Sequence, residues 1–400
     1  MQIIHGNGAV SHLSYCSNIH PGESWAEVRQ NLVQYLPDIR QAMNPDGEFG
    51  IGLRLSAAAV ADLADQNALT EFKTFLDDNQ LYVFTINGFP YGPFHGTRVK
   101  EDVYLPDWQD AERLRYTNQL ADVFAEFLPA GQVGSVSTVP GAFWSSINGV
   151  DDIWSMTRHM VEHAAHLVEL ERNTGKRIVL ALEPEPCCFL ETIEQSVAFF
   201  RDFLFSSESQ SQLAGLLGVS PSQADLLLHR HLTLCLDLCH AAVEFESYDA
   251  CIADLRGAGI GIGKLQISAG LRLESVTRDT IDLLKPFEDN VYLHQVVENC
   301  GGSLNRFADL AEAFAALDDD NAEREWRVHF HVPIFLDDLG DFSSTQFFVR
   351  EALDKHRTDP VSTHLEVETY TWNVLPAQYR QQSIDAAIVR ELQWVSDRLS

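Results

Sequence analysis

The stretch ALEPEP (181–186) places two carboxylates, Glu183 and Glu185, between prolines directly after the apolar residues 178–180. An ionised carboxylate is costly to bury unless it is paired or binds a metal. Proline cannot donate a hydrogen bond within a central strand, so a strand that reaches this point should end here. We therefore expect a buried strand to deliver Glu183, with Glu185 beside it, to a site at its carboxyl end.

A second candidate follows in LCLDLCH (234–240), where Asp237 ends an apolar run and His240 stands three residues later. An aspartate and a neutral imidazole in one loop can share a divalent cation, or one can bind the metal while the other contacts substrate. The alternative is an aspartate that caps the next helix, with a structural histidine beside it. The neighbouring carboxylates of ALEPEP favour the first interpretation.

Histidines and carboxylates also alternate along two late segments. In WRVHFHVP, His329 and His331 share one face of an expected strand, and His331 is the better candidate for a ligand. In HLEVETYTW, Glu366 and Glu368 share a face and would repel each other unless a cation or a proton lay between them. Glu368 is the expected ligand, and Glu366 is expected to lie deeper, beside a basic group. The alternatives are strands whose polar faces meet water.

Further polar residues follow or end the expected strands and could contact a substrate. The candidates for substrate contact are His20, Asn87, His240, Gln266, His294 and Glu366. No cluster of Lys or Arg marks a phosphate site, which favours a ligand without phosphate.

Ten short apolar segments alternate with amphipathic helical patterns, which predicts βα units and a parallel sheet. They are 12–18, 49–55, 81–87, 133–139, 177–183, 232–238, 262–268, 291–297, 326–335 and 364–370. A doubly wound sheet would need a glycine-rich phosphate loop, and GNGAV near the start lacks its final glycine. Polar residues at the ends of many strands indicate instead an α/β fold of the (β/α)8 (TIM) barrel kind.

Ten segments exceed the eight of such a barrel, so one or two of the last three should form an inserted hairpin or a lid. We expect an inserted helical segment near 206–231 and extra late strands near 285–335. No internal repeat or linker divides the chain, which predicts a single domain over 1–400.

The composition restricts the partners. The chain of 400 residues has 28 Lys+Arg against 58 Asp+Glu, a formal net charge of -30. This charge disfavours nucleic acids and anionic membrane surfaces as partners.

A secretory signal is not recognisable, and no apolar run reaches the ~18 residues of a membrane span. Seven cysteines without a CxxC spacing indicate a reducing compartment. We expect a cytoplasmic protein that binds a small molecule and does not insert into a membrane.

The sequence resembles the xylose isomerase-like barrel superfamily of sugar isomerases and epimerases in three features. A Glu ends one expected strand, D-x-x-H ends the next, and a Glu lies in the last strand. The resemblance implies a divalent metal ion (Mn, Mg, Zn or Fe) on Glu183, Asp237 and Glu368. It also implies that Glu183 and Glu368 move a proton between substrate carbons, while His240 contacts the substrate.

One departure concerns the histidine ligand of that superfamily. The strand that should bring it reads KLQIS, with Gln266 at this place. Either His331 replaces the histidine from another strand, or the metal site is altered or lost.

Longer motifs resemble the E component of bacterial ebo clusters over nearly the whole chain, among them YCSNIHPGESW, INGFPYGPFHG, LEPEPCC, LDLCHAAVEFE and RVHFHVPIF. That resemblance implies a metabolite-traffic protein of secondary metabolism, with partner proteins from the same cluster. Two functions follow: a metal-dependent isomerase or epimerase, or a carrier that keeps the pocket without chemistry. Metal-assisted hydrolysis is less favoured, because the early HxH of barrel hydrolases is absent.

Overall fold

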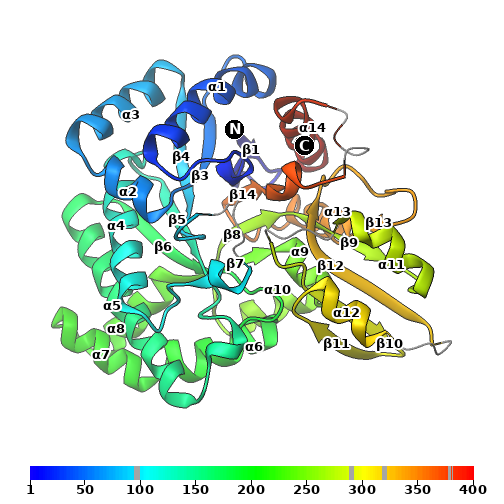
Figure 1. Cartoon of the computed structure of the whole chain (residues 1–400). Helices are drawn as coiled ribbons and strands as arrows, with labels where there is room; N and C mark the ends of the chain where they lie inside the picture. The colour runs from blue at the N-terminus through cyan, green and yellow to red at the C-terminus, as the bar shows by residue number, and fades with distance from the viewer. Residues whose placement is uncertain (94–99, 288–291, 318–321, 377–379, 381) are drawn as a thin grey trace.

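Eight parallel strands form the predicted barrel in the computed structural model, which describes residues 1–93, 100–287, 292–317, 322–376, 380 and 382–400 (Figure 1). A parallel bridge between Cys16 and Gly52 brings the first strand beside the second and nearly closes the ring. The strands are β2 (Val10–Tyr15), β3 (Phe49–Arg54), β4 (Leu81–Asn87), β5 (Val133–Thr138), β6 (Arg177–Leu182), β7 (Leu232–Asp237), β8 (Ile262–Ile267) and β14 (His364–Val367). A short ninth strand, β1 (Gln2–Ile4), pairs antiparallel with β2.

Helices surround this ring, and local signals fix their ends. Ser24 and Glu27 form a capping box at the start of α1, and Gly175 ends α5 in the left-handed region at φ 70. The helices around the barrel are α1 (Trp25–Met43), α2 (Ala57–Leu63), α3 (Gln66–Asp78), α4 (Ala111–Phe127), α5 (Val150–Thr174), α6 (Ile193–Phe199), α7 (Ser207–Leu217), α8 (Pro221–His231), α10 (Tyr248–Gly257), α13 (Gln346–His356) and α14 (Ile384–Leu399). The consecutive helices α7 and α8 lie between β6 and β7.

A second, antiparallel sheet leaves the barrel directly after β8, with the order β11-β10-β12-β9-β13. Its strands are β9 (Ala269–Leu273), β10 (Val296–Cys300), β11 (Ser303–Phe307), β12 (Arg324–Val332) and β13 (Ser343–Ser344). Figure 1 shows it beside the barrel with α11 (Arg278–Leu284) and α12 (Leu310–Ala316). The short helix α9 (Leu238–Val243) follows β7 and contacts β9 and β12, so it joins the two sheets.

This sheet corrects two expectations. The strand predicted at 291–297 begins only at Val296, and residue 291 lies outside the described residues. The extra strands begin at Ala269, earlier than expected, because the chain turns at Ser268 straight from a barrel strand into β9. His329 and His331 therefore belong to the second sheet and not to the barrel interior.

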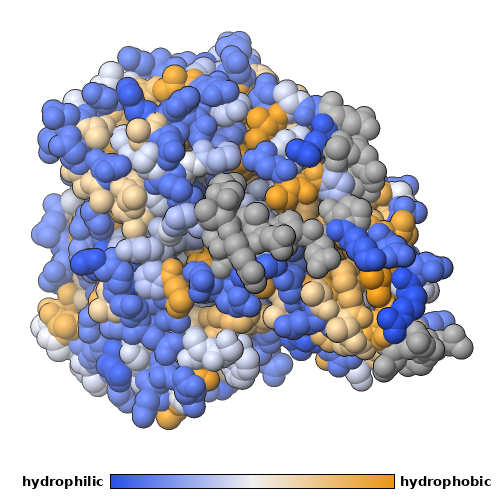
Figure 2. Space-filling model, viewed as in Figure 1, coloured by the Kyte–Doolittle hydropathy of each residue, from blue (hydrophilic) through white to orange (hydrophobic). Residues whose placement is uncertain are grey.

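The surface of the molecule agrees with its acidic composition. On the face shown in Figure 2, hydrophilic side chains predominate. Among the described residues, none of the helices combines the length and the apolar character that crossing a bilayer requires.

A buried ion pair crosses the barrel interior below the strand ends. Lys264 Nζ on β8 contacts a carboxylate oxygen of Glu366 on β14, and both side chains are 0% exposed. Lys264 also donates to Asn87 Oδ1. Gly52 makes room for the pair, since a Cβ at this position would overlap the Glu366 carboxylate. The expectation that Glu366 lies deep beside a basic group is confirmed.

We predict that Lys264→Met lowers the free energy of unfolding by about 3–5 kcal/mol, because it leaves the Glu366 carboxylate buried without a partner. The double variant Lys264→Met/Glu366→Leu should recover most of this loss, since it removes both charges. Urea denaturation followed by circular dichroism measures both values. A single variant as stable as the unaltered chain would contradict the importance of this pair.

Candidate functional site

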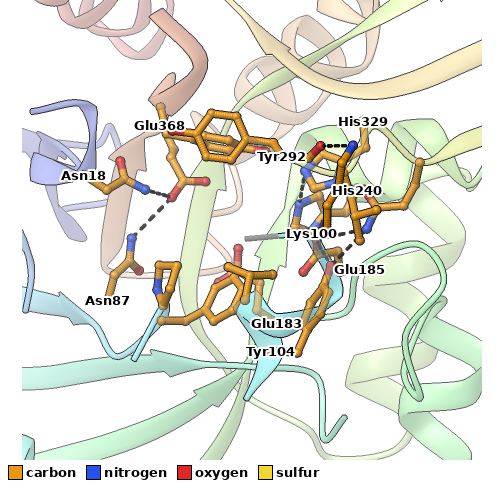
Figure 3. Close-up of a pocket in the computed structure, with 16 residues that line it drawn as sticks. Asn18, Asn87, Lys100, Tyr104, Glu183, Glu185, His240, Tyr292, His329 and Glu368 are labelled. Atoms are coloured by element: carbon orange, nitrogen blue, oxygen red, sulfur yellow. Dashed lines mark hydrogen bonds and ion pairs between the residues drawn. The ribbon is translucent and has the colours of Figure 1, made fainter. Parts of the chain in front are cut away.

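A narrow cavity lies at the carboxyl ends of the barrel strands, between the barrel and the second sheet (Figure 3). The space left in it for the centres of water molecules is about 50 Å³. Barrel loops, the segment 100–104 and the second sheet all contribute walls. The lining residues are Asn18, Asn87, Phe89, Pro90, Lys100, Val103, Tyr104, Glu183, Glu185, His240, Tyr292, Leu293, Gln295, His329, Glu368 and Tyr370.

Glu183 and Glu368 enter this cavity from different strands and are linked by one amide. Glu183 follows β6, and Glu368 follows β14. Gln266 Nε2 on β8 donates to Glu183 Oε1 at 2.8 Å and also to Glu368 Oε2. Gln266, at the position where the sequence resemblance led us to expect a histidine ligand, thus holds a donor group that contacts both carboxylates.

Two amides from the first half of the barrel hold the other oxygen of Glu368. Asn18 Nδ2 donates to Glu368 Oε1 at 2.7 Å, and Asn87 Nδ2 donates to the same oxygen at 3.3 Å (Figure 3). These bonds fix the orientation of the carboxylate in the cavity. Asn18 and Asn87 both line the cavity.

Burial raises the pKa values of both glutamates. The pKa of Glu183 is raised well above its usual value, first by burial and then by the charges of Glu368 and Asp237. The pKa of Glu368 is raised to about 8, again by burial first and then by the charge of Asp237. Near neutral pH the pair therefore keeps at least one proton.

Asp237 caps α9 through one of its carboxylate oxygens. Its Oδ1 accepts from the His240 backbone N–H at 2.9 Å and from Ser268 Oγ at 2.7 Å. Its Oδ2 is buried and has no hydrogen-bond partner among the described residues. Burial raises the pKa of Asp237, but the nearby His240 and His331 and these hydrogen bonds outweigh burial, so the pKa is lowered from its usual value. The capping interpretation is correct for Oδ1 and leaves Oδ2 available.

Three imidazoles meet beside Asp237. His240 Nε2 lies 3.0 Å from His329 Nε2, which lies 3.2 Å from His331 Nε2. All three side chains are buried, so the interpretation of β12 as a strand with histidines in water is wrong. Of the two β12 histidines, His329 lines the cavity, while His331 lies behind it.

Glu185, the second carboxylate of ALEPEP, lies on the other side of His329. Tyr104 Oη donates to Glu185 Oε1 at 2.6 Å, and Gln295 Nε2 lies 3.4 Å from the same oxygen. Burial raises the pKa of Glu185, and the charge of His240 and the hydrogen bond from Tyr104 oppose this. Tyr104 was not predicted from the sequence, because the stretch KEDVY carries no strand-end pattern.

Three of the predicted substrate contacts lie away from the cavity. His20 stacks on Tyr35 with ring centroids 4.2 Å apart, on the outer side of the first strand end. His294 stacks on Phe330 at 5.1 Å behind the cavity wall. Glu366 lies deeper, in the ion pair described above. Of the other candidates, Asn87 and His240 line the cavity and Gln266 lies directly behind it.

Comparison with known proteins gives the fold alone. No protein-family model and no curated protein matches the sequence. A xylose isomerase-like TIM barrel protein from Mycobacterium smegmatis, solved in complex with magnesium, is 12% identical, with 97% of this chain and 96% of that chain covered and a TM-score of 0.50. The probable 3-DHS dehydratase AsbF from Bacillus anthracis is 13% identical, with 96% of this chain and 97% of that chain covered and a TM-score of 0.47. The IolI protein with a bound zinc atom is 12% identical, with 97% of this chain and 98% of that chain covered and a TM-score of 0.46. This chain thus has the xylose isomerase-like TIM-barrel fold.

The donor groups at the site fit a divalent cation. Asp237 Oδ2 is buried without a hydrogen-bond partner in the part of the chain that the structure describes. Glu183, Asp237 and His240 each bring a ligand atom within 4.8 Å of the others. Lys264, the buried cation below them, is already paired with Glu366. A cation would therefore balance carboxylates that the described residues leave without a counter-charge.

We predict that the metal-free protein becomes less stable as the pH rises from about 5 to about 8. The folded-state pKa of Glu368 is raised to about 8, above its unfolded value, so the folded state binds the proton more tightly and loses this advantage as the pH rises. Glu368→Gln should make the decline shallower, by up to about 1.4 kcal/mol per pH unit. Urea unfolding with a chelator at several pH values measures the slopes.

The matched control for this experiment is Glu169→Gln, which alters an exposed glutamate on α5. It should leave the pH dependence unchanged. Equal slopes for Glu368→Gln and the unaltered protein would show that Glu368 does not carry this pH dependence.

Proposed function

We propose that this chain is a divalent-metal-dependent isomerase or epimerase of the xylose isomerase-like kind, acting on a small polar metabolite. The observation that carries the proposal is the pair Glu183 and Glu368. These carboxylates come from separate barrel strands, line one cavity and are linked by Gln266. The magnesium complex of the Mycobacterium smegmatis protein, which shares the fold, supports the metal.

Isomerisation and epimerisation need two groups that take a proton from one carbon and return a proton to a carbon. The raised pKa values of Glu183 and Glu368 favour retention of protons on the pair, and loss of one proton would leave one protonated and one ionised carboxyl group. The ionised member would accept the proton from a carbon beside a carbonyl, and the protonated member would donate one. Gln266 would hold both in position throughout.

A divalent ion, when bound, polarises a substrate carbonyl or hydroxyl and stabilises the negative charge that develops there. The expected ligands are Glu183, Asp237, His331 and Glu368, and the ion is of the Mn, Mg, Zn or Fe kind. Asn18 and Asn87 would orient substrate hydroxyl groups, since both amides line the cavity.

The resemblance to the E component of ebo clusters suggests the pathway in which the protein would act. The substrate would be an unphosphorylated intermediate of a secondary-metabolite trafficking pathway, and proteins of the same cluster would be partners. The protein would act in the cytoplasm as one domain. The acidic surface accords with a metabolite rather than a nucleic acid as partner.

A carrier without chemistry is the second candidate, and one observation favours it. Gln266 contacts both carboxylates where the superfamily has a histidine ligand. An amide in that place would let the barrel keep its pocket without the metal. The cavity would then hold a metabolite for transfer to a partner.

We predict that the metal-loaded protein exchanges a carbon-bound hydrogen of an unphosphorylated keto sugar with solvent. D-fructose and related ketoses in D₂O are suitable probes, and NMR measures deuterium at the carbons beside the carbonyl. Glu183→Gln and Glu368→Gln should each lower the exchange rate by about 100-fold or more, as expected for loss of an acid–base group. Glu169→Gln should leave it unchanged. Binding of a ketose without exchange would favour the carrier.

A further inference from the structure

We infer that the metal at this site is held by three imidazoles, those of His240, His329 and His331, with Asp237 as the fourth ligand. This assignment rests on the proposed function, because it names the ligands of the metal in the same cavity. It differs from the expected carboxylate set in leaving Glu183 and Glu368 unligated, so that they remain available for proton transfer.

The hydrogen bonds of two of the rings fix which nitrogen carries the proton. His240 Nδ1 lies 2.8 Å from the backbone oxygen of Pro184, and His331 Nδ1 lies 3.0 Å from the backbone oxygen of Glu368. A carbonyl oxygen can only accept, so each Nδ1 must carry the hydrogen. In the neutral rings, both Nε2 atoms therefore present a lone pair.

The third ring is oriented in the same way by Gln295. His329 Nδ1 lies 2.8 Å from Gln295 Oε1. The amide of Gln295 is not reversed, because its Nε2 lies 3.2 Å from the carbonyl oxygen of Pro186 and 3.4 Å from Glu185 Oε1, which both accept. His329 Nδ1 is thus also a donor, and its Nε2 carries the third lone pair. Metal-binding histidines commonly make this bond through their second nitrogen.

The three lone pairs point at one another at a spacing that suits a metal. The Nε2 atom of His329 lies 3.0 Å from that of His240 and 3.2 Å from that of His331. One proton could bridge only two of the three atoms, so a proton alone does not satisfy the cluster. Around a tetrahedral ion with bonds of 2.0–2.1 Å, neighbouring ligand atoms lie about 3.3 Å apart.

Asp237 completes the set. Its Oδ1 lies 3.9 Å from His240 Nε2, and the aspartate and His331 bring ligand atoms within 4.8 Å of each other. Its Oδ2 is buried without a hydrogen-bond partner among the described residues. The Asp237 carboxylate therefore lies near the imidazoles and has one oxygen that accepts no hydrogen bond from the described residues.

The chemistry of these ligands selects the metal. Three imidazoles and one carboxylate suit zinc and related transition metals, whereas magnesium prefers six oxygen ligands. His240 and His329 also line the cavity, so a molecule bound there can reach the ion. The site should bind Zn²⁺, and Co²⁺ as its coloured substitute, far more tightly than Mg²⁺.

Calorimetric titration of the chelator-treated protein with Zn²⁺ tests which residues bind the metal. His329→Gln and His331→Gln should each weaken Zn²⁺ binding by more than about 100-fold, the upper end of losses caused by changes around a ligand. Gln295→Leu, which removes the acceptor of His329 Nδ1, should weaken it by about 10–100-fold. Glu368→Gln should weaken it much less than His331→Gln, because the Glu368 carboxylate lies 3.5 Å from His331 Nδ1, the nitrogen that faces away from the proposed metal.

Three controls accompany these variants. His166→Gln, which alters a histidine that contacts Asp122 on the outside of the barrel, controls for the loss of one imidazole and should bind Zn²⁺ normally. In the unaltered protein, Zn²⁺ should shift the ring ¹⁵N resonances of three histidines at Nε2 and leave their Nδ1–H groups in place. Circular dichroism checks the fold of each metal-free variant.

The outcomes separate this assignment from the proposed function. Normal Zn²⁺ binding by folded His329→Gln, loss of binding in Glu368→Gln, or no shift of histidine resonances would overturn the tris-histidine site. Zn²⁺ bound by three histidines without any hydrogen exchange in the ketoses would support the site and count against the isomerase.

Discussion

Buried negative charge at the carboxyl ends of the barrel strands is the constraint on which the site depends. Glu183, Glu185, Asp237 and Glu368 are all buried around one cavity. Such charges are costly in a medium of low dielectric constant unless they are paired, protonated or bound to a cation. Neighbouring groups offset this cost by donating hydrogen bonds to individual carboxylate oxygens. Amides, a tyrosine hydroxyl and a serine donate to the carboxylates, whereas the buried Asp237 Oδ2 has no hydrogen-bond partner among the described residues.

The two sheets contribute different chemistry to this arrangement. The barrel strands supply the carboxylates, and β12 of the second sheet supplies His329 and His331. His240 of α9 joins them, since this short helix contacts both β9 and β12. The sheet that leaves the barrel after β8 is therefore part of the site. A barrel without it would keep the acid–base pair of glutamates and lose two of the three imidazoles.

The sequence was sufficient for the barrel and for much of the site. Eight of the predicted strands fall within about three residues of barrel strands, because buried parallel strands produce short apolar runs between helical patterns. The proline after Glu183 and the alternation along β12 located residues that meet in the structure. His20 and His294, expected to contact the substrate, do not line the cavity, because a strand end does not specify which way a side chain turns. Tyr104 was missed, since a loop that folds over the site leaves no periodic pattern.

The position of the metal distinguishes this account from its alternatives. Anomalous diffraction at the zinc absorption edge, from crystals of the zinc-loaded protein, measures it directly. The account predicts one strong peak at about 2.0–2.1 Å from the Nε2 atoms of His240, His329 and His331, beside Asp237. A peak between Glu183 and Glu368, or no peak at stoichiometric zinc, would contradict it.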